Sequence, residues 1–323
     1  MTLSDHPALP AVVVDRLRCP TCNAGITQST EGLSCRSGHV IACHHRYIDA
    51  RPDRVSDATA ATFRSFGYEW TRFRRIRPED EAYWWRYFAD LDVSQLQGRV
   101  GLDAGCGSGR YSVFTAQHLR ALVALDGSDA VETAASNLAG CRTATVVRAD
   151  LRRPPLAPEA FDFISCLGAL HHLEQPRQGF DALVDLLAPG GILLVYLYSR
   201  PSSWGLRSVA LRTASGLRRA TTKLPAPLLR TLSWPTALVL WLTVVRLGAL
   251  VTSRRGPTAS PLPLAAYHGM PMRSLWLDTF DRLSAPIEHR YLWEDVRPWY
   301  THRGLAVDSV RDESGLFIVA HRP

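Results

Sequence analysis

LDAGCGSGRY, residues 102–111, is the segment that says most about the fold. It contains three glycines in a G-x-G-x-G spacing: Gly105, Gly107 and Gly109. Glycines between a strand and a helix let a ligand approach the backbone closely. A nicotinamide dinucleotide fingerprint has the spacing G-x-G-x-x-G, and Arg110 stands where its third glycine would be. The stretch therefore predicts a ligand-binding turn without the nicotinamide fingerprint.

Apolar runs and helical patterns alternate from residue 99 onwards, which predicts an α/β fold with a parallel sheet covered by helices. The two helices expected after the first two strands span 109–119 and 128–139, and Ser128 is placed to cap the second. An antiparallel pair is expected at 304–313 and 315–322. The five expected parallel strands span 99–105, 120–127, 142–150, 161–168 and 190–198.

Acidic residues stand at the ends of the first three of these strands: Asp103, Asp126 and Asp150. One such acid alone is more often a solvated loop residue or a helix cap. Because the carboxyl ends of parallel strands meet at one edge of a sheet, three acids beside a glycine turn favour a nucleoside-bearing ligand.

Four segments together resemble the class I S-adenosylmethionine-dependent methyltransferases, and the match runs from about residue 63 to the C-terminus. They are LDAGCGSGRY (102–111), LDGSDAV (125–131), RADLRRPPLAPEAFDFISCLGALHHLEQP (148–176) and LAPGGILLVY (187–196). The resemblance implies a Rossmann-like seven-stranded methyltransferase sheet over 99–200 and 286–323, ending in the antiparallel pair. It also implies S-adenosylmethionine as cofactor.

The resemblance further assigns the cofactor site. Asp103 and the glycines would hold the methionine portion, Asp126 the ribose, and Asp150 with Leu151 the adenine. The upstream stretch FRSFGYEWTRF, within a helical segment at 56–98, is similar to a segment that closes over the cofactor, so Phe66, Tyr68, Glu69 and Trp70 are further candidates. An aromatic helix packed on the core is an equal alternative. The full expected set is Asp103, Gly105, Cys106, Gly107, Gly109, Asp126, Gly127, Asp150, Leu151, Leu167, Tyr68 and Trp70.

A separate metal pattern lies in residues 1–55. Its ligand candidates are Cys19, Cys22, Cys35 and His39. Two ligand-bearing turns suit a tetrahedral structural zinc, which would stabilise a module too small to fold by hydrophobic burial. Cys43, His44 and His45 are alternatives for the fourth ligand, and unrelated reduced cysteines are the alternative to a metal site. The pattern resembles the zinc ribbon of ribosomal RNA guanine methyltransferases and the short zinc-binding domain fused to many bacterial methyltransferases.

Composition and charge narrow the class of protein. The chain is 46% hydrophobic and 21% charged, as in globular proteins, and its seven cysteines favour metal binding or reduced thiols over a disulfide framework. Cys106, Cys141 and Cys166 are interpreted as reduced interior thiols. No apolar run follows the N-terminus, so we expect a cytoplasmic location.

The net charge of +7 comes from one segment. Residues 200–255 hold ten basic and no acidic side chains, and the remaining sequence has 27 basic and 30 acidic residues. This segment lies in an insertion expected at 201–285, with a basic amphipathic helix at 204–224 and an apolar helix at 230–255 whose first turn contains Pro235. Only fifteen uncharged positions separate Arg230 from Arg246, and Gly248 follows, which argues against a membrane span.

Three interpretations of the insertion remain. The favoured one is a helical lid over the acceptor pocket. The second is an interfacial helix pair that makes peripheral contact with the inner face of a membrane or with a lipid-borne substrate. The third is the contact of a homodimer.

Histidines provide candidates for catalysis, because methyl transfer to a hydroxyl or an amine gains from a base near neutral pKa. His171 and His172 follow the fourth strand, and the resemblance adds His289; a purely structural role is the alternative. Tyr267 and His268 lie in a Pro-rich connection and are interpreted as surface loop.

The sequence therefore predicts S-adenosylmethionine-dependent methylation, at oxygen, of a small-molecule or lipid-like acceptor that is attracted by basic residues. One alternative is RNA methylation, although residues 1–55 are not markedly basic; DNA is not an expected partner. A non-catalytic cofactor-binding partner subunit is the other.

Overall fold

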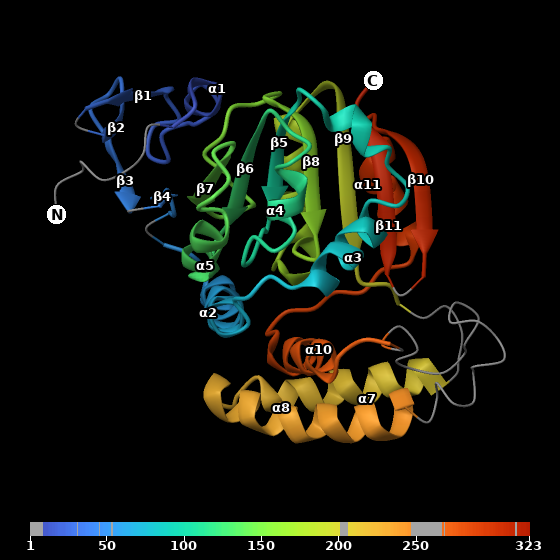
Figure 1. Cartoon of the computed structure of the whole chain (residues 1–323). Coiled ribbons are helices and arrows are strands. Elements are labelled where there is room, and N and C mark those ends of the chain that lie inside the picture. Colours follow the sequence, from blue (N-terminus) through green and yellow to red (C-terminus); the bar gives the residue numbers. More distant parts are fainter. Residues whose placement is uncertain are drawn as a thin grey trace. The chain divides into compact units, whose positions relative to one another are not determined.

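The computed structural model describes residues 9–30, 32–44, 46–52, 54–200, 206–246, 267, 269–313 and 315–323 (Figure 1). The chain divides into two units. The first comprises Met1–Arg200 and Ile287–Pro323, and the second comprises Pro201–Pro286. The insertion expected at 201–285 and the second unit have nearly the same bounds.

The expected strands form one sheet in the first unit. Its order is β7-β6-β5-β8-β9-β11-β10, with parallel pairing from β7 to β9 and antiparallel pairing of β11 with both β9 and β10. This arrangement confirms the predicted Rossmann-like methyltransferase fold. The strands are β5 (Val100–Ala104), β6 (Ala121–Asp126), β7 (Ala144–Arg148), β8 (Phe161–Leu167), β9 (Leu187–Leu197), β10 (Ala306–Asp312) and β11 (Leu316–His321).

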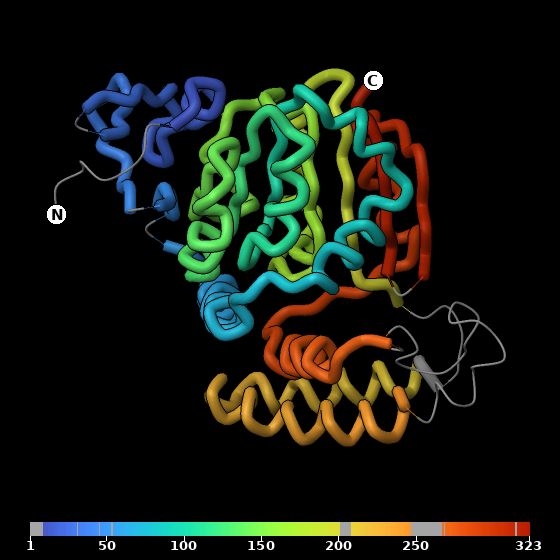
Figure 2. Tube along the Cα trace, viewed as in Figure 1, coloured from blue at the N-terminus to red at the C-terminus, as the bar shows by residue number. Residues whose placement is uncertain are grey.

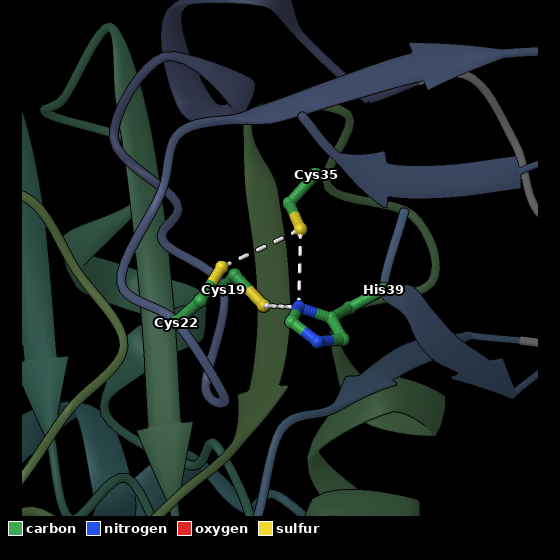
Figure 3. A group of neighbouring side chains, drawn as sticks. All are labelled: Cys19, Cys22, Cys35 and His39. Atoms are coloured by element: carbon green, nitrogen blue, oxygen red, sulfur yellow. Dashed lines mark hydrogen bonds between the residues drawn. The ribbon is translucent and has the colours of Figure 1, made fainter. Parts of the chain in front are cut away.

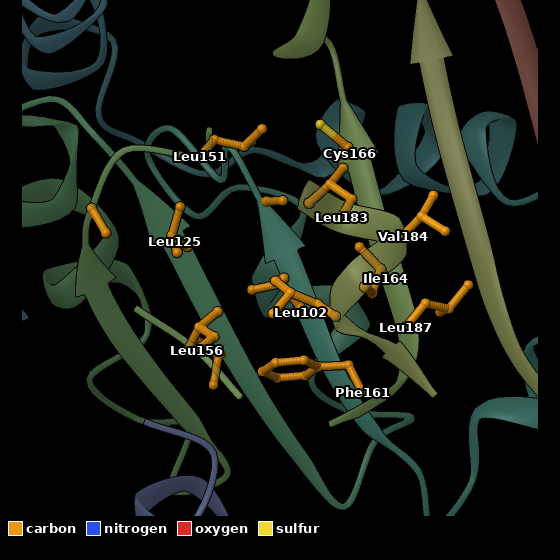
Figure 4. Close-up of a cluster of buried hydrophobic side chains, with 14 of the residues drawn as sticks. Leu102, Leu125, Leu151, Leu156, Phe161, Ile164, Cys166, Leu183, Val184 and Leu187 are labelled. Carbon is orange, nitrogen blue, oxygen red and sulfur yellow. The ribbon is translucent and has the colours of Figure 1, made fainter. Parts of the chain in front are cut away.

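Both faces of the sheet are covered, because alternate residues of the buried strands point to opposite sides. On one face Leu102 and Ile164 lie in a cluster with Leu183 of α6 (Pro176–Leu186) (Figure 4). Phe180 of α6 and Tyr300 of α11 (Trp293–His302) belong to the same cluster. The other face is covered by aromatic residues of the upstream helical segment. There Phe163 packs with Trp84 of α3 (Pro78–Tyr87) and with Phe88.

The first helix after the glycine turn is shorter than predicted. Instead of 109–119, α4 spans only Ser112–Thr115. The amides of Gln117 and His118 donate to the carbonyls of Phe114 and Thr115, three residues back, so the helix tightens and ends. The second helix, α5 (Ala130–Asn137), is also shorter than the expected 128–139, and its N-cap residue is Asp129. The Ser128 hydroxyl still accepts a hydrogen bond from the Ala130 amide.

The N-terminal segment adds strands to the same sheet, which the sequence did not predict. β4 (Tyr47–Asp49) pairs in parallel with β7, and Ile48 lies opposite Val147. The other three strands continue the sheet outward in the order β3, β2, β1: β1 (Ile26–Ser29), β2 (Gly32–Cys35) and β3 (Val40–His44). A short helix, α1 (Ala11–Val14), precedes them, and its Val13 packs into the core of the sheet.

Between this segment and β5 lie two further helical elements besides α3. Ser56 caps α2 (Asp57–Arg72) by accepting a hydrogen bond from the Thr59 amide. A 3-10 turn at Val93–Leu96 precedes β5.

The second unit is helical. α7 (Leu206–Thr221) and α8 (Ala226–Leu240) both pack against α10 (Met272–Ser284), as the tube in Figure 2 also shows. A π-helical turn at Trp241–Val245 continues α8. The expectation that Pro235 lies in the first turn is wrong, because α8 begins at Ala226 and Pro235 lies in its interior. Residues 247–266 and His268 lie outside the described residues, so the expectations for Gly248 and His268 have no structural counterpart.

By length and composition, the helix Ala226–Val245 could cross a membrane. Its apolar window has a mean hydropathy of 1.5, and 22% of that window is buried. The expectation against a membrane span counted only the fifteen uncharged positions between Arg230 and Arg246. The helix in the structure has 20 residues, because it begins before Arg230 and includes it.

Candidate functional site

The glycine turn after β5 has a backbone that only glycine adopts readily. Gly105 and Gly107 have φ values of +81° and +54°. The amides of Gly105 and Cys106 both donate to the carbonyl of Leu125, at 2.7 and 3.0 Å, which ties the turn to the end of β6. A Cβ atom at Gly105 would lie 2.2 Å from that of Ala169. The turn therefore lies close to the segment that follows β8.

Asp103 is buried at the end of β5, and two hydroxyls hold its carboxylate. Ser112 donates to Oδ2 at 2.5 Å, and Ser165 donates to Oδ1 at 3.2 Å. Burial raises the pKa of Asp103 to about 6, and the nearby charge of Asp126 adds to this effect, while both serines oppose it. A positively charged ligand group beside Asp103 would relieve this unfavourable ionisation.

Asp126 lies at the end of β6, across the glycine turn from Asp103. Together Asp103, Asp126 and the glycine turn (Gly105–Gly109) form what we call the cradle. Oδ2 of Asp126 accepts from the Gly107 amide at 3.0 Å, and its Oδ1 accepts from the amide and the hydroxyl of Ser128 at 2.8 and 2.6 Å. These donors fix the carboxylate across the glycine turn, and its side chain is partly exposed. The arrangement leaves lone pairs of the same two oxygens for ligand hydroxyls.

Asp150, the third acid, is held by its own loop. Arg152 donates to Oδ1 from its amide at 2.9 Å and to Oδ2 from its guanidinium at 2.6 Å. Leu151 is buried beside it, with one methyl group 3.9 Å from where a Gly105 Cβ would be. Leu151 and the glycine turn are therefore neighbours, as expected for one site, while the Asp150 carboxylate is already engaged by Arg152.

Helix α2 lies over both glycine-containing turns. A Cβ atom at Gly107 would approach Trp70 Nε1 to 3.0 Å, and one at Gly127 would approach the Phe63 ring to 2.3 Å. The guanidinium of Arg110 lies 4.7 Å from the centre of the Trp70 ring, which adds a cation–π contact. Aromatic residues of α2 thus pack directly on the turns of the cradle.

The other candidate residues of α2, which are Phe66, Tyr68 and Glu69, differ in their surroundings. The Tyr68 ring has the Arg72 guanidinium over it, at 5.5 Å. Glu69 is buried, with 1% of its surface exposed. The ring of Phe66 lies 4.7 Å from that of His172, so α2 also contacts the histidine pair.

The three candidate histidines come together at the ends of β8 and β9. His171 and His172 lie in a 3-10 turn, Leu170–His172, and their ring centres are 4.3 Å apart. The His289 amide donates to the His171 carbonyl at 2.8 Å, which brings the segment before α11 to this turn. His172 Nδ1 lies 2.7 Å from the carbonyl oxygen of Ile287. Since a carbonyl only accepts, Nδ1 of His172 carries a proton.

His171 is fully buried. Its ring lies 3.9 Å from that of Tyr198, and neither of its nitrogens has a hydrogen-bond partner among the described residues. Burial lowers the pKa of His171 well below its usual range, and the neighbouring His172, Arg290 and His289 lower it further. The ring of His171 is therefore neutral. His172 is also buried, with 4% of its surface exposed, and the main chain orients its ring.

Cys19, Cys22, Cys35 and His39 form one group, in which all ligand atoms lie within 4.8 Å of one another (Figure 3). The Sγ atoms of Cys22 and Cys35 are 3.6 Å apart, and His39 Nδ1 lies 3.5 and 3.4 Å from the Sγ atoms of Cys19 and Cys35. Tetrahedral zinc at its usual bond lengths requires about 3.8 Å between sulfurs and about 3.5 Å between sulfur and nitrogen. The donor set fits zinc.

The alternative ligands lie elsewhere. The Cys43 thiol contacts the Ile41 carbonyl at 3.6 Å, and His44 lies 3.7 Å from Asp49. His45 is outside the described residues. The group that the structure brings together is therefore the expected one with His39.

Sequence reasoning missed several residues of the site. Ser165 is the clearest, because a polar residue in the apolar run FDFISCL stands directly opposite Asp103 in the β5–β8 register. No sequence motif marks Ser112, Arg152 or Tyr198. Their roles come from contacts that only the folded chain makes. Cys106 lies in the glycine turn and Leu167 at the end of β8, and their roles in cofactor binding stay predictions.

Comparison with known proteins gives a family match. Residues 102–195 match the family described as "Methyltransferase domain". An uncharacterized protein of a Synechococcus strain is 30% identical over 190 residues, which cover 54% of this chain and 45% of the relative. A demethylmenaquinone methyltransferase of Clavibacter sepedonicus is 30% identical over 118 residues, covering 36% and 48%.

A ubiquinone biosynthesis O-methyltransferase of Coxiella burnetii is 28% identical over 114 residues, covering 32% of this chain and 46% of the relative. The chain thus spans about half the length of the curated relatives it matches. Among solved structures, an S-adenosylmethionine-dependent methyltransferase of Mesorhizobium loti is 18% identical, covers 75% of this chain and 98% of its own, and superposes with a TM-score of 0.45. From the family match and the sheet order, we conclude that residues 102–195 belong to a methyltransferase domain with a Rossmann-like fold.

Proposed function

We propose that the protein transfers the methyl group of S-adenosylmethionine to a hydroxyl of a small or lipid-like metabolite. The observation that carries this proposal is the neighbourhood of an acid-rich glycine turn and an oriented histidine, both at the carboxyl edge of one parallel sheet. Ligands of open α/β sheets bind at that edge.

The cradle residues have distinct roles in this proposal. Asp103 and the amides of the glycine turn hold the amino-acid portion of the cofactor, and Asp126 accepts from the ribose hydroxyls. Leu151 contacts the adenine, and Arg152 keeps the Asp150 carboxylate in place beside it. The cofactor supplies a methyl group on a sulfonium, an electrophile that needs no further activation.

His172 is the proposed base. The acceptor oxygen forms the new bond to the methyl carbon as the carbon–sulfur bond breaks, and the hydroxyl proton passes to Nε2 of His172. The contact between Nδ1 and the Ile287 carbonyl supports this role, because it leaves the lone pair on Nε2. His171 and His289 act as positioning residues, since the His171 ring packs against His172 and its carbonyl accepts from the His289 amide.

The nature of the acceptor is supported by the relatives. Two of them are named for demethylmenaquinone and for ubiquinone biosynthesis, and the second name specifies methylation at oxygen. From these names we extend to this chain only the class of acceptor, a small metabolite with a hydroxyl group. The helical second unit then selects the acceptor, and the protein works in the cytoplasm or in peripheral contact with a membrane.

We also propose that the group of Cys19, Cys22, Cys35 and His39 binds structural zinc. Four protein ligands leave no open position for a reacting molecule, so the metal would stabilise the N-terminal strands rather than take part in the reaction.

The test is methyl transfer from labelled S-adenosylmethionine to hydroxylated quinones, to a lipid extract and to total RNA, with products identified by mass spectrometry. We expect methylated small molecules, and His172→Asn should lower turnover by about 100-fold while leaving cofactor binding intact. Label in RNA, with binding that weakens steeply with salt, would overturn the proposed acceptor class. Tight cofactor binding without turnover of any acceptor would support a non-catalytic subunit.

A further inference from the structure

Helix α8 and its π-helical continuation present a stripe of apolar side chains to solvent. Leu228, Leu232, Val239 and Leu242 are 47%, 49%, 57% and 52% exposed, and exposed Pro235 completes the stripe at helical spacing. The opposite side is formed by Leu229, Ser233 and Ala237, of which the last two are fully buried. A surface helix of a globular protein normally has the reverse arrangement.

The polar residues on this outer side direct their hydroxyls inward. Thr231 donates to the Pro227 carbonyl at 3.0 Å, Thr236 to Leu232 at 3.0 Å and Thr243 to Val239 at 2.7 Å. Each hydroxyl donor is thereby satisfied within the helix, four residues back. The surface consequently needs little hydrogen bonding from its surroundings, which suits contact with hydrocarbon better than contact with water.

The same region is basic. Residues 206–246 contain seven arginines and lysines and no acidic residue. Arg212, Arg219, Lys223 and Arg246 are exposed, and the Arg246 guanidinium lies 4.9 Å from the Trp241 ring. Basic side chains beside exposed leucines match the two layers of a membrane surface, anionic headgroups over hydrocarbon.

We infer that the outer surface of α8, defined by Leu228, Leu232, Pro235, Val239 and Leu242, docks on a lipid bilayer that carries anionic headgroups. The helix lies in the plane of the interface, because its other side is bound to α10. Trp276 donates to the Ser233 hydroxyl at 3.0 Å and lies under the Arg230 guanidinium, 5.2 Å from its ring centre. Spanning the membrane would break these contacts.

Charge decides between a bilayer and a second copy of this chain. Two copies joined through this surface would bring their arginines and lysines together without an acidic residue from 206–246 to compensate. Like charges in an interface are unfavourable, whereas an anionic headgroup layer is complementary. The inference stands without the proposed methyl transfer, and together the two would bring the enzyme to lipid-borne acceptors.

The test is co-sedimentation of the full chain with phosphatidylcholine vesicles, alone or with roughly 30% phosphatidylglycerol. We expect binding to the anionic vesicles, weakened several-fold by added salt. Val239→Asp should lower binding about tenfold or more, and the double variant Arg219→Gln, Lys223→Gln should lower it several-fold. The matched control is Val310→Asp, an exposed valine on β10 of the first unit, which should bind as the wild type does.

Thermal unfolding and binding of S-adenosylhomocysteine report separately on folding and on the cofactor site, so a failure of the proposed function is distinguishable. Equal sedimentation of all variants, or none with anionic vesicles, would overturn the inference. Two other results would replace it. Loss of a solution dimer in Val239→Asp without vesicle binding would assign the surface to self-association. Protein that resists an alkaline wash of the vesicles would assign the helix to a membrane span.

Discussion

Asp103 is a buried acid through which pH acts on the stability of the first unit. Its pKa is raised to about 6, mainly by burial, so the folded chain holds a proton that the unfolded chain has released between about pH 4 and pH 6. Stability is therefore expected to fall as pH rises through this range. Asp103→Asn should remove this slope, which amounts to roughly 3 kcal/mol for a shift of about two pKa units.

Urea unfolding at intervals from pH 4 to pH 8 measures this slope. The control is Asp92→Asn, because Ser94 lowers the pKa of the Asp92 carboxyl and that residue is exposed. The control should keep the wild-type fall in stability between pH 4 and pH 6. A slope that persists in Asp103→Asn would show that another group is responsible.

Gly105 combines a left-handed backbone with a close contact. Its φ is +81°, and a Cβ would overlap that of Ala169 at 2.2 Å, so Gly105→Ala should destabilise the first unit by about 3 kcal/mol or more. Gly98 has a similar φ of +78° with nothing within 4 Å of the added atom. Gly98→Ala should therefore cost only about 1–2 kcal/mol, the backbone part alone. Equal losses in chemical denaturation would mean that the contact with Ala169 relaxes freely.

At the scale of secondary structure, the parallel strands were predictable because each is a short apolar run between turn signals. β5 and β6 are buried along nearly their whole length, and such strands have a clear hydrophobic pattern. The pairing of β4 with β7 was not predictable. The pairing depends on two contacts between segments far apart in the sequence. The Arg148 guanidinium lies 3.7 Å from the Asp49 carboxylate, and the Ala50 amide donates to the Arg148 carbonyl.

The helices of the second unit illustrate a different limit. Periodicity predicts a polar and an apolar side for 204–224, but the burial of residues 208–224 in the structure follows neither side. In the structure Ser208 is buried, whereas Val209 and Leu217 are more than half exposed. Small polar residues let helices approach closely, and the Thr221 hydroxyl donates to the Leu283 carbonyl of α10 at 2.7 Å. Such contacts depend on the partner helix and not on the local sequence.

For the candidate site, the residues that resemblance assigned were the ones that stand in motifs, such as Asp103 and Asp126. The residues that hold them come from other strands and loops, such as Ser165 and Arg152. Their roles follow from register and loop geometry, which a single sequence does not encode locally.

The N-terminal strands offer a test of the metal ligands. Because β4 joins the central sheet, loss of zinc should destabilise more than the N-terminal segment. His39→Ala should bind less than one zinc per chain and should unfold about 10 °C lower. Cys43→Ala, the matched control, should retain the metal, because the Cys43 thiol lies outside the ligand group. Metal analysis and calorimetry give both readouts, and metal loss in Cys43→Ala with retention in His39→Ala would reverse the assignment of the fourth ligand.

At the scale of the whole molecule, the charge of the chain divides along the same boundary as its contacts. All charged side chains of residues 200–255 are basic, and this segment falls almost entirely within the second unit. The rest of the sequence has a small net negative charge. The cofactor cradle, the histidines and the metal ligands all belong to the first unit. We propose that the first unit binds the cofactor and that the second unit selects the acceptor and its location.

Replacing residues 201–286 with a short Gly-Ser linker tests this division of roles. The two points where the insertion joins the first unit are held near each other. Ser199 and Tyr291 form an isolated β-bridge, and the Arg200 amide donates to the Tyr291 carbonyl at 2.9 Å. A linker of about six residues, which can extend to roughly 20 Å, should therefore close the chain without strain. We expect the variant to bind S-adenosylhomocysteine within about threefold of the wild type, because every cradle contact is retained. Methyl transfer to a lipid-like acceptor should fall by about 100-fold or more, and vesicle binding should disappear, because both depend on the helices that were removed. Calorimetry of cofactor binding, vesicle sedimentation and circular dichroism measure the three outcomes on one preparation. A variant that stays folded yet loses the cofactor would show that the second unit completes the cradle, and the two units would then act as one site.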